Sequence, residues 1–124
     1  MKLLVDTQAA LWLLLDDERL SETARGLLFD DTVACFLSAA SVWEAAIKRG
    51  LGKLDAPEDM HTQIERHGVL GLPVYDRHAA QVADLPHHHS DPFDRLLVAQ
   101  AIEEGMSILS ADQILRKYDV DVIW

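Results

Sequence analysis

The stretch that decides the fold is "KLLVDTQAALWLLL", at residues 2–15. Residues 2–5 form a short apolar run that is typical of a buried strand, and residues 7–15 predict a helix that is apolar on nearly all sides. Asp6 stands alone between the two runs. A buried strand that passes through one acid into a buried helix is the first half of a β-α-β unit.

The rest of the chain repeats this alternation. Short apolar runs predict strands at 32–37, 69–74, 106–109 and 120–124. Helices are predicted from about Ser21, then at 41–54 with an end at Gly50 or Gly52, and at 56–68, 75–85 and 92–104. Strands that alternate with helices predict a parallel sheet with helices on both faces. No repeat or linker divides the sequence, so we expect residues 1–124 to form one domain.

Composition limits the function classes. The chain has 124 residues, of which 49% are apolar, and a formal net charge of −10. This charge argues against binding nucleic acid through a broad basic face, but it allows a local site in which cations neutralise carboxylates.

The compartment is indicated by the cysteine and by the apolar runs. Cys35 is the single cysteine and lies in the apolar run "TVACFL", which predicts a buried thiol in a reducing environment. Asp6 interrupts the first apolar run, and the next run, residues 9–15, is far shorter than the ~20 residues that span a bilayer. We therefore expect a soluble, cytoplasmic protein with no membrane partner.

Four acids follow predicted strands, at the places where an α/β sheet carries its ligand crevice. Each alone has an ordinary structural explanation. Asp6 can cap the first helix, Ser41 and Glu44 match a capping box, and Asp94 meets the helix dipole behind the cap Asp91. Asp112 or Ser110 can cap a last helix. Together the acids favour a site of hard oxygen ligands for a divalent cation. The four are Asp6, Glu44, Asp94 and Asp112.

Several motifs resemble one known family along nearly the whole chain. They are "LLVDTQAALWLL", "SAASVWEAAIKRGLGKL", "HHHSDPFDRLLVAQA" and the closing "YDVDVIW". The combination resembles the PIN-domain ribonuclease toxins of bacterial toxin–antitoxin pairs, the VapC type. The resemblance implies a three-layer α/β/α sandwich with a short, mainly parallel central sheet.

The resemblance also implies an activity. It predicts a Mg²⁺-dependent endoribonuclease, with Mn²⁺ able to substitute, that leaves 5′-phosphate and 3′-hydroxyl ends on its RNA substrate. It implies a cognate antitoxin that inserts an arginine into the acid crevice, and a homodimer. Carried over by motif, the catalytic and metal-binding residues are Asp6, Glu44, Asp94 and Asp112, and the supporting residues are Thr7, Ser41, Asp91, Arg95 and Ser110.

The supporting residues have alternatives. Thr7 and Ser110 orient acids or cap helices, and Arg95 either contacts phosphate or pairs with a neighbouring acid. Lys48 fits a simple i,i+4 partner of Glu44. The run His87–His89 predicts a loop rather than a zinc site, because successive side chains diverge. Ser90 stands where relatives often carry arginine, and Ser110 where they often carry threonine.

Three other functions remain open. A phosphatase of the haloacid dehalogenase type also has an aspartate after its first strand, but it needs a second one two residues later, where this chain has Gln8. A housekeeping RNA-processing nuclease would share the same site. A non-catalytic module would hold a partner's basic side chain in the acid pocket.

Overall fold

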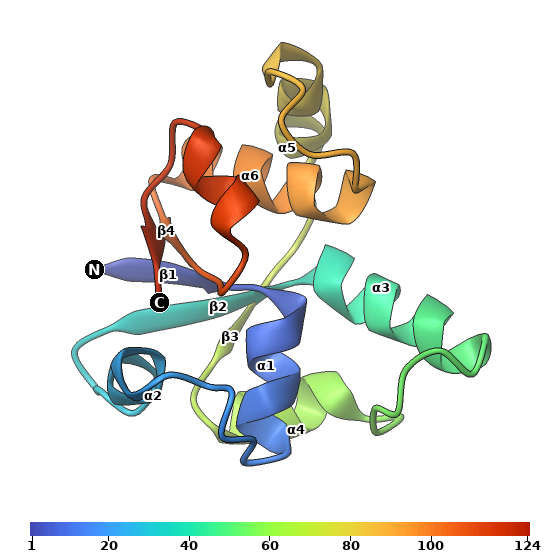
Figure 1. The fold of residues 1–124 in the computed structure, drawn as a ribbon, viewed down its shortest axis with the longest axis vertical. Coiled ribbons are helices and arrows are strands. Elements are labelled where there is room, and N and C mark those ends of the chain that lie inside the picture. Colours follow the sequence, from blue (N-terminus) through green and yellow to red (C-terminus); the bar gives the residue numbers. More distant parts are fainter.

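A single sheet of five parallel strands forms the centre of the molecule (Figure 1). The computed structural model describes residues 1–124. The strands are β1 (Lys2–Val5), β2 (Ala34–Ser38), β3 (Leu70–Leu72), β4 (Ser107–Leu109) and β5 (Val122–Ile123), in the spatial order β3-β2-β1-β4-β5. The predicted α/β sandwich is confirmed, and its sheet is parallel throughout.

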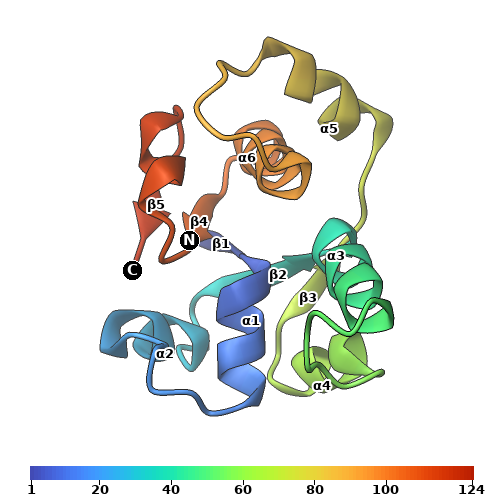
Figure 2. The ribbon, with the colours of Figure 1, turned by 45° about the vertical axis from the view of Figure 1, so that its right-hand side comes forward.

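Helices cover both faces of the sheet (Figure 2). One face carries α1 (Thr7–Leu14), α2 (Glu22–Leu28) and α4 (Met60–Arg66). The other carries α5 (Asp76–Gln81), the 3-10 turn η1 (Val82–Asp84), α6 (Pro92–Glu104) and the 3-10 helix η2 (Gln113–Lys117). Helix α3 (Ala39–Gly50) follows β2 and contacts both α1 and α6. No helix is long and apolar enough to cross a membrane.

The central strands separate two apolar cores because successive side chains of a strand point to opposite faces. Leu3 and Val5 of β1 pack with α1, α2 and α4, whereas Leu4 packs with α6 and η2. The predicted burial of Cys35 is confirmed, since it is 4% exposed in the first core, and burial raises the pKa of its thiol. Burial of β1 on both faces fixes where Asp6 leaves the sheet.

The sequence predicts α6 well and α3 less well. The observed bounds of α6 agree with the predicted helix, because Asp91 accepts hydrogen bonds from the backbone N–H groups of Phe93 and Asp94 and Gly105 ends it at φ 65°. Helix α3 begins two residues before Ser41, with Ser38 as its N-cap. The predicted capping box of Ser41 and Glu44 is therefore wrong.

Two other predicted helices are shorter than expected. The helix expected over 56–68 begins only at Met60, whose N–H donates to the carbonyl of Pro57 in a turn. The helix expected over 75–85 is the short α5 followed by η1. The second change allows the chain after η1 to turn back toward the start of α6.

Candidate metal centre

An acidic crevice of about 370 Å³ lies at the carboxyl ends of the strands. It is lined by all four of the predicted acids and by other residues from the ends of β1 and β4 and from α1, α3 and α6. The structure therefore brings the predicted acids together. The lining residues are Asp6, Thr7, Gln8, Leu11, Glu44, Lys48, Leu54, Asp91, Asp94, Ala111 and Asp112.

Asp6 follows β1 directly and is buried at the base of α1. It is 8% exposed, and its Oδ1 accepts a hydrogen bond of 2.7 Å from the N–H of Ala9, so it caps α1 as well. Burial raises its pKa to about 6, although hydrogen bonds from Ser110 and Ala9 oppose the shift. The charges of Asp112 and Glu44 raise it further. A cation in the crevice would offset this repulsion.

Glu44 is held by two partners. It is 6% exposed; Oε1 accepts a hydrogen bond of 2.7 Å from the Thr7 hydroxyl, and Oε2 lies 2.6 Å from Lys48 Nζ. The predicted i,i+4 pairing of Lys48 is confirmed, and Glu44 raises the pKa of this lysine. Thr7 orients an acid, one of the two roles expected of it.

Asp91 is the helix cap that the sequence predicts, and Asp94 follows it in the first turn of α6. Asp91 Oδ1 lies 2.8 Å from the N–H of Phe93 and 3.4 Å from that of Asp94, so this side chain is the cap. Asp94 turns into the crevice, where burial raises its pKa to about 7. The charge of Asp91 adds to this shift, while His89 opposes it.

Asp112 and the two serines have separate positions. Asp112 Oδ1 accepts from the N–H of Ile114 at 2.9 Å and so caps η2. Ser110 Oγ accepts from the N–H of Asp112 at 3.0 Å, which orients the turn that carries this acid. Ser41 is buried in α3 and its Oγ has no hydrogen-bond partner. It does not line the crevice.

Arg95 lies outside the crevice. It is 8% exposed, and its guanidinium donates to the carbonyls of Pro86 and Val82 and to the hydroxyl of Tyr118, at 2.9, 3.2 and 3.2 Å. Arg95 forms no ion pair with a neighbouring acid, and its guanidinium does not line the crevice. The arginine instead fastens the chain before α6 onto that helix.

His89 is the site residue that the sequence did not reveal. Its Nε2 lies 3.2 Å from Asp94 Oδ2 and 3.0 Å from Asp112 Oδ2. The ligand-capable atoms of these three residues all lie within 4.8 Å of one another. The sequence predicts only a loop for the histidine run. The signal that could have identified His89 is its position two residues before Asp91, the cap of α6.

The donor set fits a hard divalent cation. Four carboxylates from separate elements line one crevice, and the two with the strongest shifts have pKa values raised by burial and by neighbouring negative charge. Repulsion between these carboxylates is unfavourable when no cation is bound, and a bound cation relieves it. Oxygen ligands suit Mg²⁺ or Mn²⁺.

Comparison with known families agrees with this geometry. The family model described as "PIN domain" matches residues 3–121, which is nearly the whole chain. The chain belongs to the PIN-domain family. PIN domains are generally nucleases, so membership supports a hydrolase that acts on nucleic acids. None of the curated proteins matches the sequence.

Solved structures share the fold of this PIN domain. VapBC2 from Rickettsia felis, bound to a DNA fragment from the promoter, matches with a TM-score of 0.68 at 11% identity, over 99% of this chain and 98% of that one. FitAB bound to an IR36 DNA fragment matches with a TM-score of 0.64 at 22% identity, over 98% and 93%. FitAcB from Neisseria gonorrhoeae matches with a TM-score of 0.56 at 20% identity, over 98% and 96%.

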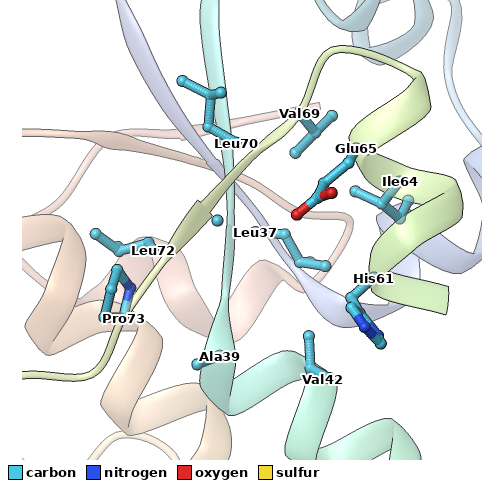
Figure 3. Close-up of a pocket in the computed structure, with 11 residues that line it drawn as sticks. Leu37, Ala39, Val42, His61, Ile64, Glu65, Val69, Leu70, Leu72 and Pro73 are labelled. Atoms are coloured by element: carbon cyan, nitrogen blue, oxygen red, sulfur yellow. The ribbon is translucent and has the colours of Figure 1, made fainter. Parts of the chain in front are cut away.

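A second hollow of the PIN domain has a different character. It has a volume of about 390 Å³ and lies between α4 and the edge strand β3, where apolar side chains face one another (Figure 3). Its only titratable lining residues are His61 and Glu65, and it contains none of the four acids. The acidic crevice is therefore the better candidate for a metal site.

The crowded acids predict a dependence of stability on pH. The pKa values of about 6 for Asp6 and about 7 for Asp94 exceed the value of 3.8 that an unfolded aspartate has. Between pH 5 and 7 the folded PIN domain thus holds protons that the unfolded chain has released. Its free energy of unfolding should therefore fall by about 2–4 kcal/mol over this range in the absence of divalent cations.

Urea unfolding in chelator at pH 5, 6, 7 and 8 measures this decline. The double variant Asp6→Asn, Asp94→Asn is the control, because its two amides do not titrate. The free energy of unfolding of the wild type should fall increasingly below that of the variant from pH 5 to pH 7, and the gap should then level off. A wild-type protein that gains stability over the variant in this range would contradict the assignment.

Proposed function

We propose that this PIN domain is a Mg²⁺-dependent endoribonuclease, for which Mn²⁺ can substitute, and that it is the VapC-type toxin of a toxin–antitoxin pair. One observation carries the proposal. Four acids from the ends of β1 and β4 and from α3 and α6 line a single crevice at the carboxyl end of a parallel sheet. Cleavage of RNA by this toxin would inhibit translation or growth.

The side chains have distinct tasks in this proposal. Asp6, Asp94 and Asp112 would hold the cation, and Glu44, oriented by Thr7 and Lys48, would complete the acidic wall. The bound cation would supply Lewis-acid chemistry, lowering the pKa of water and neutralising charge on the phosphate. With a net charge of −10, the chain needs such a cation to admit RNA.

The proposed partner is an antitoxin protein. The structures that share this fold include VapBC2 and FitAB, each bound to a DNA fragment, and these two-component complexes support a partner of the same kind here. A basic side chain of the antitoxin would neutralise the acid crevice in place of a cation. The complex would then store the nuclease in an inactive form.

We also propose a homodimer in the cytoplasm. Trp43, Ile47 and Leu51 follow one another at four-residue intervals along and just beyond α3, and all three are exposed. Four-residue spacing places side chains on one face of a helix, so they form an apolar stripe that a second copy can cover. The free thiol of Cys35 supports a reducing compartment.

Cleavage of a mixed pool of cellular RNA tests the activity. Purified, antitoxin-free protein should cut the pool into discrete fragments with Mg²⁺ or Mn²⁺ and should lose this activity in chelator. The fragments should carry 5′-phosphate and 3′-hydroxyl ends. Mapping these ends would identify the RNA target, and it would separate a toxin from a housekeeping nuclease by the kind of RNA that is cut.

The opposite result is equally informative. Folded, metal-loaded protein that leaves every RNA of the pool intact would contradict the nuclease proposal. Tight binding of a basic antitoxin peptide by the same protein would then favour the non-catalytic module.

A further inference from the structure

The loop before α6 is anchored from two sides. The Tyr118 hydroxyl accepts hydrogen bonds from the backbone N–H groups of His88 and His89, at 3.2 and 2.9 Å, and from Arg95 at 3.2 Å. Tyr118 is 4% exposed and ends η2, whereas Arg95 belongs to the first turn of α6. The backbone at His89 is thus held between the elements that carry Asp94 and Asp112.

The same loop determines which nitrogen of His89 carries the proton. Its Nδ1 accepts a hydrogen bond of 3.1 Å from the N–H of Asp91 and therefore has no proton of its own in the neutral ring. The proton is then on Nε2, which faces Asp94 Oδ2 and Asp112 Oδ2. With the side chain only 15% exposed, water competes little for this contact.

We propose that His89 is a positioning residue of the metal centre, whose Nε2–H holds Asp94 and Asp112 in the arrangement that binds a divalent cation. The two acids come from different elements, α6 and the end of β4, and their like charges repel each other. One N–H donor between them holds them together before a cation arrives. This inference rests on one part of the proposed function, the binding of a divalent cation in the crevice, and it does not require RNA cleavage.

The hydrogen bonds distinguish this role from that of a ligand. A nitrogen that carries a proton cannot bind a metal, and moving the proton to Nδ1 would oppose the N–H of Asp91. Asp94 keeps its Oδ1 free of hydrogen bonds to the protein, so this oxygen can bind a cation while Oδ2 lies 3.2 Å from His89 Nε2. His89 therefore orients the two acids and is not itself a metal ligand.

Mn²⁺ binding, followed by the electron paramagnetic resonance signal of the free ion at pH 7.5, tests the proposal without measuring RNA cleavage. His89→Ala should weaken Mn²⁺ binding about tenfold, as is typical for loss of a group that orients metal ligands. His89→Gln keeps an N–H near the position of Nε2 and should stay within about threefold of wild type. His89→Asn resembles only the Nδ1 side and should behave like alanine.

His87→Ala is the matched control, since His87 is an exposed neighbour in the same run. It should bind Mn²⁺ as the wild type does, and thermal unfolding of all variants checks that they fold. Unchanged binding by folded His89→Ala would overturn the proposal. So would weak binding by His89→Gln together with a nitrogen coupling on bound Mn²⁺ that disappears in His89→Ala, because the histidine would then be a ligand.

The two hypotheses fail in different ways. Wild-type protein that binds no Mn²⁺ would contradict the metal centre itself, and with it the proposed nuclease and the role of His89. If the wild type binds Mn²⁺ and every His89 variant binds it equally tightly, only the role of His89 would be contradicted.

Discussion

Replacing Asp94 with asparagine should lower metal-dependent RNA cleavage by at least about a hundredfold, more than the loss of a group that merely orients a ligand. The change removes a charged oxygen ligand and leaves the shape of the side chain. The protein should still fold, because Asp91 and not Asp94 caps α6. The pKa of about 7 shows that the folded state already disfavours this charge, so the variant should be at least as stable as the wild type at pH 8.

Asp91→Asn is the matched control for this experiment. Asparagine caps a helix as well as aspartate does, so this variant should keep most of the activity and the stability. Initial rates of RNA cleavage with saturating Mg²⁺ compare the two variants directly. Equal losses at the two positions would show that the division between cap and metal ligand is wrong.

Replacing Arg95 with methionine should reduce the free energy of unfolding by about 3 kcal/mol, because this side chain is only 8% exposed and its guanidinium makes three hydrogen bonds of about 1 kcal/mol each. The acceptors are the carbonyls of Pro86 and Val82 and the hydroxyl of Tyr118. Methionine fills part of the same volume but donates no hydrogen bond. The loop that ends at His89 should loosen as well, so Mn²⁺ binding should weaken in protein that remains folded.

Arg116→Met tests whether the loss of a positive charge alone has this effect. Arg116 is an exposed arginine of η2 and forms no ion pair, so its replacement should change the stability by less than about 0.5 kcal/mol. Urea unfolding of both variants at pH 7.5 provides the comparison. Similar stability of the two variants would mean that the hydrogen bonds of Arg95 contribute little.

The sequence predicted the parts of this molecule that depend on local signals. Helix α6 has a cap, a proline in its first turn and a glycine at its end, and its predicted bounds agree with the structure. Asp6, Glu44 and Asp112 come after strands, and parallel strands bring their carboxyl ends to one edge, so the meeting of these three acids could also be predicted. Asp94 reaches the same crevice from the first turn of α6, which follows η1 and a loop rather than a strand.

Contacts between distant segments could not be predicted. Nothing in the run of three histidines indicates which ring turns inward, because that choice depends on Tyr118, which lies 29 residues after His89. Arg95 was expected near phosphate or an acid because it follows Asp94 directly, but neighbouring residues of a helix point in different directions. Two of its three partners lie in the returning chain from Val82 to Pro86, whose path depends on α5 ending early.

The order of the strands also determines when the crevice can form during synthesis. Strand β1 precedes the other four strands along the chain but lies at the centre of the sheet, where Leu4 pairs with Ile108 of β4. Contacts so distant along the chain form late, because a long loop must close first. A nascent chain that has reached residue 90 contains Asp6 and Glu44 but neither Asp94 nor Asp112. The acidic crevice is therefore incomplete until residue 112 has been synthesised and β4 has paired with β1.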